Sequence, residues 1–436
     1  MKENVLQFGV IGLGNIGTGL VKNFIKNLDL IQSRAGIKLK LAKIADIDLR
    51  NKSHVQLDEK VYTTQASDII DDPNIPIVVE LVGGTTVAKD FIIRSIERKK
   101  KVVTANKALL AECGSEIIES LKKNPGAEVF FEASVGGGIP VIKVLREGFI
   151  GNEIQGITAI INGTANYILT EMEQRAVPFD QALQSAQEKG FAEPDPSLDI
   201  EGIDSAHKIA ILGSIAFGAW IDFKKIYVEG ISGITIQDII YAKRLGYRIK
   251  LLAIARKSKK GIETRVNPAL LDFHHPLSSV ESSNNAVYIK GFPIGESMLY
   301  GKGAGDNPTS SAVISDIVDA AKSVKLGALA TQHIFNRIDA QVDFADKMSW
   351  ETRYYVRIQA EDKPGVLAGV AGIFAHHDIS ISSVLQQEES IDATVPVVMM
   401  THIAREKNMI SACQEIEKLD CIQGKVTIIR VLTQPS

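Results

Sequence analysis

Hydrophobic runs of strand length alternate with amphipathic, helix-like stretches along the first third of the chain. Apolar runs at 5–11, 37–48, 75–84 and 100–111 each end in small, polar or acidic residues. This order is typical of buried parallel strands, whose carboxyl ends meet at one edge of a sheet. The pattern therefore predicts an α/β fold with a Rossmann-type nucleotide-binding domain over residues 1–150.

From about residue 150 the pattern changes, and two further domains are expected. Residues 156–172 suggest a strand followed by a helix, and the apolar run 209–221 suits a buried helix. We expect an α+β substrate and dimerisation domain over 151–301, with about 302–330 completing the nucleotide-binding domain. After a linker at 331–352, residues 353–436 follow the order βαββαβ.

Composition narrows the function classes. The chain has 436 residues, 45% of them hydrophobic and 23% charged, which is typical of a globular protein with two or three domains. A net charge of −3 gives no electrostatic reason to expect nucleic acid or an anionic membrane as partner. The three cysteines are far apart, and neither they nor the histidines have metal-ligand spacing, so we expect a cytoplasmic protein.

A glycine-rich turn follows the first predicted strand. Gly12, Gly14 and Gly17 form G-x-G-x-x-G between strand and helix, the arrangement that binds a dinucleotide pyrophosphate at a helix N-terminus. Asn15 and Ile16 complete this loop, and Thr104 and Lys107 follow a later strand on the same expected edge. Lys107 is predicted to face the cofactor, with an exposed helix position as the alternative.

The second strand carries the residues that bear on cofactor choice. Asp46 would accept hydrogen bonds from a ribose and repel a 2′-phosphate, which favours NAD over NADP. Asp48 is the alternative acid for this role, and Arg50 and Lys52 lie where they would meet a 2′-phosphate. The residues lean towards NAD and leave NADP open.

The segment "GFAEPDPSLDIEGIDSAHK" (190–208) gathers five carboxylates and ends in Lys208. Asp204 and Lys208 are four residues apart and therefore share one helix face. The apolar run that follows places Lys208 at the edge of a core, where a lysine can act as proton donor or acceptor. The surrounding acids would bind a substrate ammonium group.

At this point the sequence resembles homoserine dehydrogenase. The resemblance is carried by A-x3-G-F-A-x2-D-P-x2-D-I-x-G-x-D-x3-K at 186–208, with "TANK" at 104–107 and "FEASVGGGIP" at 131–140. "NGTANYIL" at 162–169 and "GKGAGDNPTSSAV" at 301–313 agree in order. The match covers roughly residues 5 to 340.

The resemblance implies reversible reduction of L-aspartate 4-semialdehyde to L-homoserine with NAD or NADP, on the route to threonine, methionine and isoleucine. It implies Lys208 as proton donor, Lys107 as its assistant, and Glu193 with Asp204 as ligands of the substrate ammonium. Gly190, Gly303 and Gly305 would line the cofactor. A sodium ion would be held by Glu132, Val135, Gly137 and Ile139, whereas the residues alone favour a hinge in that loop.

The C-terminal module resembles an ACT domain at Asp362, Gly365, Val366 and Leu367. ACT domains bind small amino acids and usually work in pairs, so we expect inhibition by threonine and a homo-oligomer, either dimer or tetramer. A structural dimerisation module is the alternative for this part. For the whole chain, the alternatives are an ACT-bearing 2-hydroxy-acid dehydrogenase and a non-catalytic amino-acid sensor.

Overall fold

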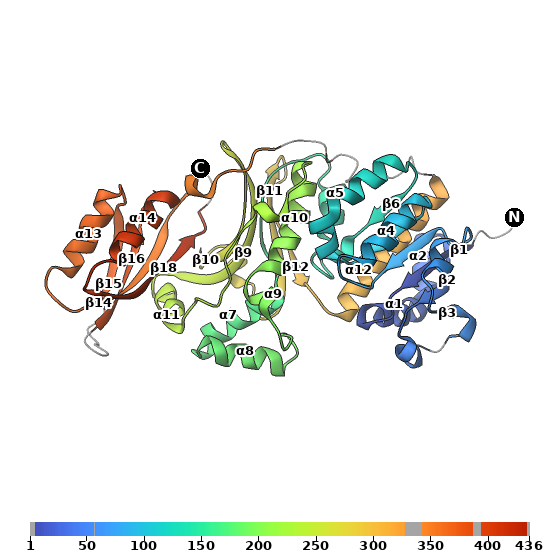
Figure 1. The fold of residues 1–436 in the computed structure, drawn as a ribbon, viewed down its shortest axis with the longest axis horizontal. Coiled ribbons are helices and arrows are strands. Elements are labelled where there is room, and N and C mark those ends of the chain that lie inside the picture. The colour runs from blue at the N-terminus through green and yellow to red at the C-terminus, as the bar shows by residue number, and fades with distance from the viewer. Residues whose placement is uncertain (1–4, 56, 328–337, 339–341, 387–393, 434–436) are drawn as a thin grey trace. The chain divides into compact units, whose positions relative to one another are not determined.

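A computed structural model describes residues 5–55, 57–327, 338, 342–386 and 394–433 (Figure 1). The chain forms two compact units, each built from segments that are far apart in the sequence. The first unit comprises Met1–Gly163, Asp204–Ile226 and Asn284–Val342. The second comprises Thr164–Ile203, Tyr227–Ser283 and Asp343–Ser436.

A six-stranded parallel sheet forms the first half of unit one. Its order β3-β2-β1-β4-β5-β6 is that of a dinucleotide-binding Rossmann fold. The strands are β1 (Val5–Ile11), β2 (Lys38–Ala45), β3 (Tyr62–Thr63), β4 (Ile77–Glu80), β5 (Lys101–Thr104) and β6 (Glu128–Phe130). The helices are α1 (Asn15–Lys26), α2 (Leu28–Ala35), α3 (Ser67–Ile70), α4 (Val87–Glu97) and α5 (Lys107–Lys123). The predicted Rossmann-type fold is confirmed.

The core of this sheet includes a helix from much later in the chain. Helix α12 (Asp306–Leu326) packs on α1 and buries Val313 and Ile317 in one cluster with Phe8 and Val10. Asn23 of α1 also donates to Ser310 Oγ at 2.6 Å. Figure 1 shows α12 in gold among the blue elements of the sheet. The late segment therefore supplies part of the nucleotide-binding domain's own core.

Two predicted boundaries differ from the structure. The run 100–111 is a strand only to Thr104, and helix α5 begins at Lys107. The helix expected from the acidic segment begins at Ile203, because a short turn of helix, α9 (Ser197–Ile200), precedes it. Helix α12 ends at Leu326, and residues 331–337 and 339–341 of the linker expected at 331–352 lie outside the described ones.

Unit one continues with an antiparallel group and a buried helix. Strand β11 (Asn284–Phe292) pairs with β7 (Glu153–Ile160) on one side and β12 (Gly295–Lys302) on the other. Helix α10 (Ile203–Phe217) has eleven buried residues, including Asp204 and Lys208. A helix with so little exposed surface holds any polar side chain it carries in one fixed place.

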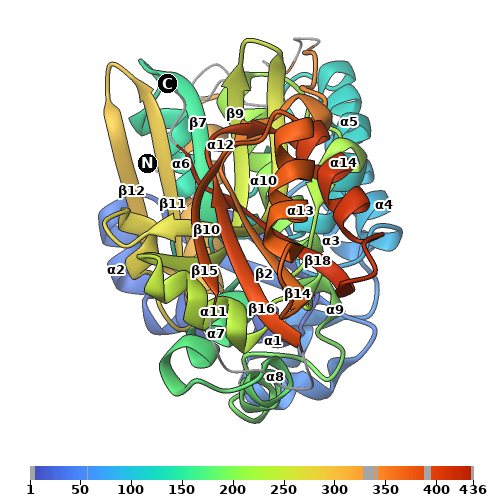
Figure 2. The same cartoon turned by 90° about the vertical axis from the view of Figure 1, so that its left-hand side faces the viewer.

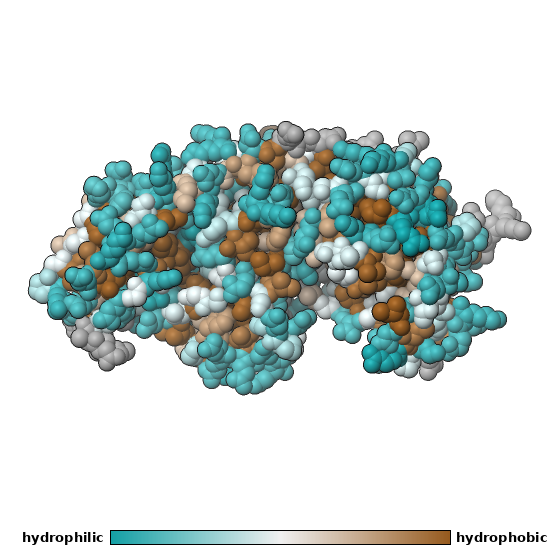
Figure 3. Space-filling view, in the orientation of Figure 1, coloured by the Kyte–Doolittle hydropathy of each residue, from teal (hydrophilic) through white to brown (hydrophobic). Residues whose placement is uncertain are grey.

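Unit two combines a helical pair with a long hairpin. Its helices include α7 (Gly163–Arg175), α8 (Phe179–Glu188) and α11 (Ile236–Arg244). Helix α8 buries Ala182 and Ala186, and its outer side chains are hydrophilic in Figure 3. Strands β9 (Tyr247–Ser258) and β10 (Gly261–Asp272) pair over their full length, and β8 (Tyr227–Val228) pairs with β10.

The C-terminal module has the predicted βαββαβ order. It consists of β14 (Tyr354–Glu361), α13 (Val366–His376), β15 (Ile381–Gln386), β16 (Thr394–Thr401), α14 (Glu406–Ile416) and β18 (Ile422–Val431), with a short pair β13 (Glu351–Thr352) and β17 (Ala404–Arg405) beside it. Figure 2 shows α13 and α14 beside each other in front of its strands, and the two helices contact one another. Strand β18 also pairs with β10, so one sheet runs through both parts of unit two.

Among the residues that the structure describes, no helix has the length and apolar character needed to cross a membrane.

Candidate active site

Lys208 and Asp204 lie one turn apart on α10, and each is only 7% exposed. Lys208 Nζ donates to Asp204 Oδ2 at 2.6 Å and to the backbone carbonyl of Ile161 at 2.7 Å. Exposed ion pairs of this spacing contribute a few tenths of a kcal/mol, whereas this pair is buried and fixed by a second hydrogen bond. The pair is therefore built to hold the ammonium group in one position.

Two more side chains converge on the Asp204 carboxylate. Asn162, which follows β7, donates to Oδ2 at 2.9 Å. Lys107 Nζ lies 3.1 Å from Oδ1, and its side chain is 40% exposed. The fold thus brings together Lys107, Asp204 and Lys208, which were predicted to form one site. Lys107 lies about a hundred positions before the other two in the sequence.

These contacts control the charge of Asp204. Burial alone would raise the pKa of this carboxyl, but the nearby charges of Lys208 and Lys107 outweigh that effect. The net result is a pKa well below the usual range, and hydrogen bonds from Lys208 and Asn162 lower it further. Asp204 is consequently an anion at any pH at which the protein works.

A buried acid that sequence reasoning missed, Glu80, organises the strand ends next to Lys107. Its carboxylate accepts hydrogen bonds from Thr104 Oγ1 at 2.7 Å and from the backbone N–H of Val82 at 2.7 Å. Thr104 Oγ1 accepts from the N–H of Asn106, whose side chain caps α5. The sequence signal that could have identified Glu80 is an acidic residue at the last position of a fully buried strand. This chain of bonds fixes where α5, and hence Lys107, begins.

The glycine loop has the geometry that a dinucleotide requires. Gly12 has φ +104°, and a Cβ there would meet the Leu81 backbone at 2.7 Å. A Cβ on Gly17 would lie 2.1 Å from the Gly12 carbonyl oxygen, so the helix packs on the strand only without one. Gly14 has open space beside it, with the exposed Asn15 and half-buried Ile16 next in the chain.

A cavity of about 360 Å³ lies beside this loop, lined by Gly12, Gly14, Asp46 and Phe91 among others. Asp46 Oδ2 accepts a hydrogen bond from the N–H of Leu13 at 2.5 Å, and Oδ1 accepts from the N–H of Asp48 at 2.9 Å. The residues that line the cavity therefore fit a nucleotide, with a carboxylate where a ribose would lie.

The basic residues beyond Asp46 already have acidic partners. Arg50 Nε donates to both Asp48 oxygens, at 2.9 and 2.8 Å. Lys52 Nζ lies 3.1 Å from Glu59 Oε2. A 2′-phosphate would have to displace these carboxylates before either cation could bind it.

Glu193 and Gly190 belong to unit two. Gly190 has φ +73° after α8, and the backbone carbonyl of Glu193 accepts from Gln187 Nε2 at 3.3 Å. The Glu193 side chain is exposed in the described loop. Their approach to Lys208 stays a prediction. Asp195 Oδ1 accepts a hydrogen bond from the N–H of Ser197 at 3.1 Å and so shapes the loop.

Comparisons with known proteins decide what kind of site this is. Residues 12–132 match the family model "Homoserine dehydrogenase, NAD binding domain", 140–318 match "Homoserine dehydrogenase", and 354–421 match "ACT domain". Homoserine dehydrogenases of Pseudomonas aeruginosa and Bacillus subtilis are 41% and 37% identical, each match covering 98% of both chains. The chain belongs to the homoserine dehydrogenase family.

Solved structures of the family agree. A homoserine dehydrogenase from Thiobacillus denitrificans superposes with a TM-score of 0.93 at 41% identity, covering 98% of each chain. A hyperthermophilic archaeal homoserine dehydrogenase mutant, in complex with NADPH, has a TM-score of 0.62 at 27% identity and covers 73% of this chain and 98% of its own. The chain is thus an oxidoreductase with an NAD-binding domain, and the hydroxy-acid dehydrogenase and sensor alternatives are not favoured.

The loop that the resemblance assigns to sodium lies at the end of β6. Glu132 is 4% exposed, and its oxygens accept the N–H groups of Ile142 and Lys143 at 2.9 and 2.7 Å. Burial raises the pKa of Glu132 to about 7, against the lowering effect of these hydrogen bonds. Lys143 Nζ lies 2.6 Å from Asp319 Oδ2 rather than pairing with Glu132, and a sodium ion at this carboxylate stays a prediction.

The same loop contacts the second predicted glycine turn. The N–H of Gly138 donates to the carbonyl of Lys302 at 3.0 Å, and a Cβ on Gly137 would lie 2.6 Å from the Gly303 carbonyl oxygen. Gly305, with φ +114°, starts α12. The predicted cation loop, with Val135 and Ile139, and the predicted cofactor turn are therefore one packed structure.

In the ACT module the predicted effector loop lies between β14 and α13. Gly365 has φ +93° and precedes α13, Asp362 Oδ1 accepts from Gln386 Nε2 at 3.3 Å, and Leu367 is 40% exposed. Val366 packs against the module's core. An amino-acid effector suits this family module, and its identity stays a prediction.

Proposed function

We propose that Lys208 is the proton donor in the reversible reduction of L-aspartate 4-semialdehyde to L-homoserine. The observation that supports this role is the buried ammonium group held between Asp204 Oδ2 and the Ile161 carbonyl. A lysine ammonium has three N–H donors, and these two bonds leave the third for a substrate oxygen. The bound nicotinamide supplies hydride to the carbonyl carbon when the semialdehyde is reduced.

Proton movement follows from this geometry. As negative charge develops on the carbonyl oxygen, Lys208 donates its proton and becomes neutral. In the oxidation direction, neutral Lys208 takes the hydroxyl proton, and the Asp204 anion stabilises the ammonium that forms. Asp204 acts only through its fixed charge, because its lowered pKa keeps it ionised.

Lys107 has a different role in this proposal. It contacts the other oxygen of Asp204 and is more exposed than Lys208, which suits a cation that reaches towards substrate and nicotinamide. There its charge stabilises the developing oxyanion. Asp204 and, from the predicted loop, Glu193 stay the proposed ligands of the substrate ammonium.

For the cofactor, we propose a preference for NAD, since Asp46 faces the cavity and Arg50 and Lys52 are paired with acids. The cofactor would be lined by the residues predicted from the sequence, which are Gly12, Gly14, Asn15, Ile16, Gly17, Thr104, Lys107, Gly190, Gly303 and Gly305. A sodium ion at Glu132 would stabilise the loop and takes no part in the chemistry. Threonine is the proposed effector of the ACT module, in a homo-oligomer.

Steady-state oxidation of L-homoserine with NAD and NADP, by wild type and two Lys208 variants, tests the mechanism. Lys208→Arg keeps a cation beside Asp204 but cannot give up its proton near neutral pH, and Lys208→Ala removes both functions. We expect both variants to lose at least about 10²-fold in kcat, with Lys208→Arg the better folded. Lys123→Arg and Lys123→Ala, at an exposed lysine in the last turn of α5, are the matched controls. Wild-type kcat in a folded Lys208→Arg would overturn the proposal.

A further inference from the structure

One buried side chain on α10 takes no part in the mechanism above. His207 lies beside Lys208 and one turn after Asp204, and it is 7% exposed. Its ring stacks on Phe223 with centroids 4.4 Å apart, and its Nε2 lies 3.2 Å from Glu112 Oε1. The histidine therefore contacts a residue of another helix.

That other helix is α5, which begins at Lys107. Glu112 lies five residues into it, about one and a half turns from Lys107. Helices α5 and α10 are thus linked by two polar side-chain contacts, the ion pair of Lys107 with Asp204 and the approach of the His207 ring to Glu112. The contact between Glu112 and His207 does not include Lys107, Asp204 or Lys208, the residues proposed to act in the reaction.

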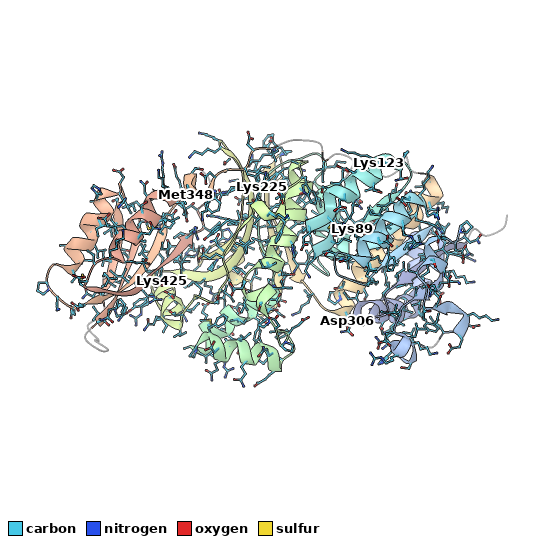
Figure 4. All side chains as sticks on the ribbon, viewed as in Figure 1. Lys89, Lys123, Lys225, Asp306, Met348 and Lys425 are labelled. Carbon is cyan, nitrogen blue, oxygen red and sulfur yellow. The ribbon has the colours of Figure 1, made fainter. Side chains whose placement is uncertain are left out.

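A third contact makes the approach of the two elements close. A Cβ on Gly114 of α5 would lie 2.1 Å from the Trp220 ring. The indole therefore packs directly against the backbone of α5 at this glycine. Trp220 is itself tied to α10, because the N–H of Ile221 donates to Ser214 Oγ at 2.9 Å. Phe223 lies on the next short turn, which ends at Lys225 (Figure 4).

Lys107 needs such support more than Lys208 does. Its side chain is 40% exposed, and lysine has a flexible stem with many rotamers. Its reach to Asp204 depends on where α5 begins and how that helix is held. A misplacement of about 1 Å in a reacting group can lower a rate by 10²-fold.

We propose that His207, acting through Glu112, is a positioning residue for Lys107: the pair holds α5 against α10 so that Lys107 stays in contact with Asp204. This inference rests on the proposed role of Lys107. The groups that face His207 are Glu112 and Lys107 from α5 and Asp204 from its own helix, with the apolar Phe223 beside them.

A double-mutant cycle on homoserine oxidation tests the inference. His207→Leu removes the polar contact at similar volume, whereas His207→Gln keeps an N–H donor. We expect His207→Leu to lower kcat about tenfold and His207→Gln to stay within about threefold of wild type. In a Lys107→Met background, His207→Leu should cause no further loss in kcat, because its effect passes through Lys107.

Glu112→Gln supplies a second variant that should fold normally, since the Glu112 side chain is 43% exposed. Its matched control is Glu116→Gln, which removes the exposed ion pair of Glu116 with Lys89 one turn further along α5. Figure 4 labels Lys89 on α4. We expect a severalfold lower kcat for Glu112→Gln and wild-type kcat for the control.

Two outcomes would overturn the inference alone. The first is a loss by His207→Leu that multiplies with that of Lys107→Met, which would mean a general packing role. The second is wild-type kcat in both His207→Leu and Glu112→Gln while Lys107→Met is slow. Wild-type kcat in Lys107→Met would instead overturn the proposed role of Lys107, and this inference with it.

Discussion

Arg430 Nη1 of the ACT module donates to Glu229 Oε2 at 2.7 Å, in the segment that follows β8. Arg430 is 6% exposed, and its Nε also donates to Glu406 Oε2 at 3.0 Å. The residues after Glu229 contact the end of the acidic loop: the N–H of Ile231 donates to the Ile200 carbonyl at 2.8 Å. A continuous set of bonds therefore joins strand β18 to the segment that leads into Asp204.

This path predicts a variant that loses regulation and keeps activity. Replacing Glu229 by Gln removes the charge that Arg430 binds, and we expect threonine to inhibit at concentrations at least about tenfold higher, a coupling loss of about 1.4 kcal/mol. Activity without threonine should stay within about twofold, because Glu229 binds Arg430 and is not among the residues that hold Lys208. Inhibition curves with increasing threonine measure both quantities.

The control for this experiment is Glu351→Gln, which weakens the exposed pair of Glu351 with Arg405 inside the same part of the chain. Threonine should inhibit this variant as it does wild type. If Glu229→Gln were inhibited at the wild-type threonine concentration, the Arg430 bond would not carry the signal. Absence of any threonine effect on the wild type would overturn the proposed effector instead.

Cofactor choice gives a second prediction. Asp46→Ala removes the carboxylate that would repel a 2′-phosphate, so we expect kcat/KM with NADP to rise at least about tenfold while that with NAD falls. Asp48→Asn frees Arg50 and should add to the gain only when Asp46 has been replaced. Glu116→Gln, which removes an exposed ion pair of α5 away from this cavity, is the control. A wild type that already prefers NADP would contradict this reading of Asp46.

The sequence predicted the parts of the site that local patterns encode. The G-x-G-x-x-G spacing located the nucleotide loop, and the i, i+4 spacing followed by an apolar run predicted that Asp204 and Lys208 share one helix face, with Lys208 at the edge of a core. Both signals lie within about twenty residues, where strand and helix periodicity determine which side chains share a face. The βαββαβ order of the last module could be predicted from the sequence for the same reason.

Contacts between segments that are distant in the sequence could not be predicted from these local patterns. The Ile161 carbonyl that holds Lys208, the reach of Lys107 to Asp204 and the pairing of His207 with Glu112 depend on how separate elements pack. Periodicity shows on which face of its own helix or strand a residue lies. It does not show which residue of another element that side chain contacts. The strand end at Thr104 was missed because Lys107 to Ala111 continue an apolar run that a helix cap at Asn106 interrupts.

Glu132 gives the last prediction, a dependence of stability on pH and sodium. Its pKa is raised to about 7 in the folded protein from an ordinary value of 4.5. The folded state therefore binds a proton that the unfolded state has lost between these values, and stability falls as pH rises from about 4.5 to 7. The full effect is about 3 kcal/mol at most. Sodium favours the ionised carboxylate, so added NaCl should raise Tm more at pH 8 than at pH 5.

Thermal unfolding at both pH values, in NaCl and in matched choline chloride, measures this effect. Glu132→Gln keeps the shape without the charge, and we expect its Tm to lose both the pH dependence over this range and the specific response to sodium. Choline matches the ionic strength and is too large for the loop. Equal responses to the two salts in wild type would contradict the cation site. A Tm that rises between pH 5 and 7 in the same way in wild type and Glu132→Gln would contradict the raised pKa.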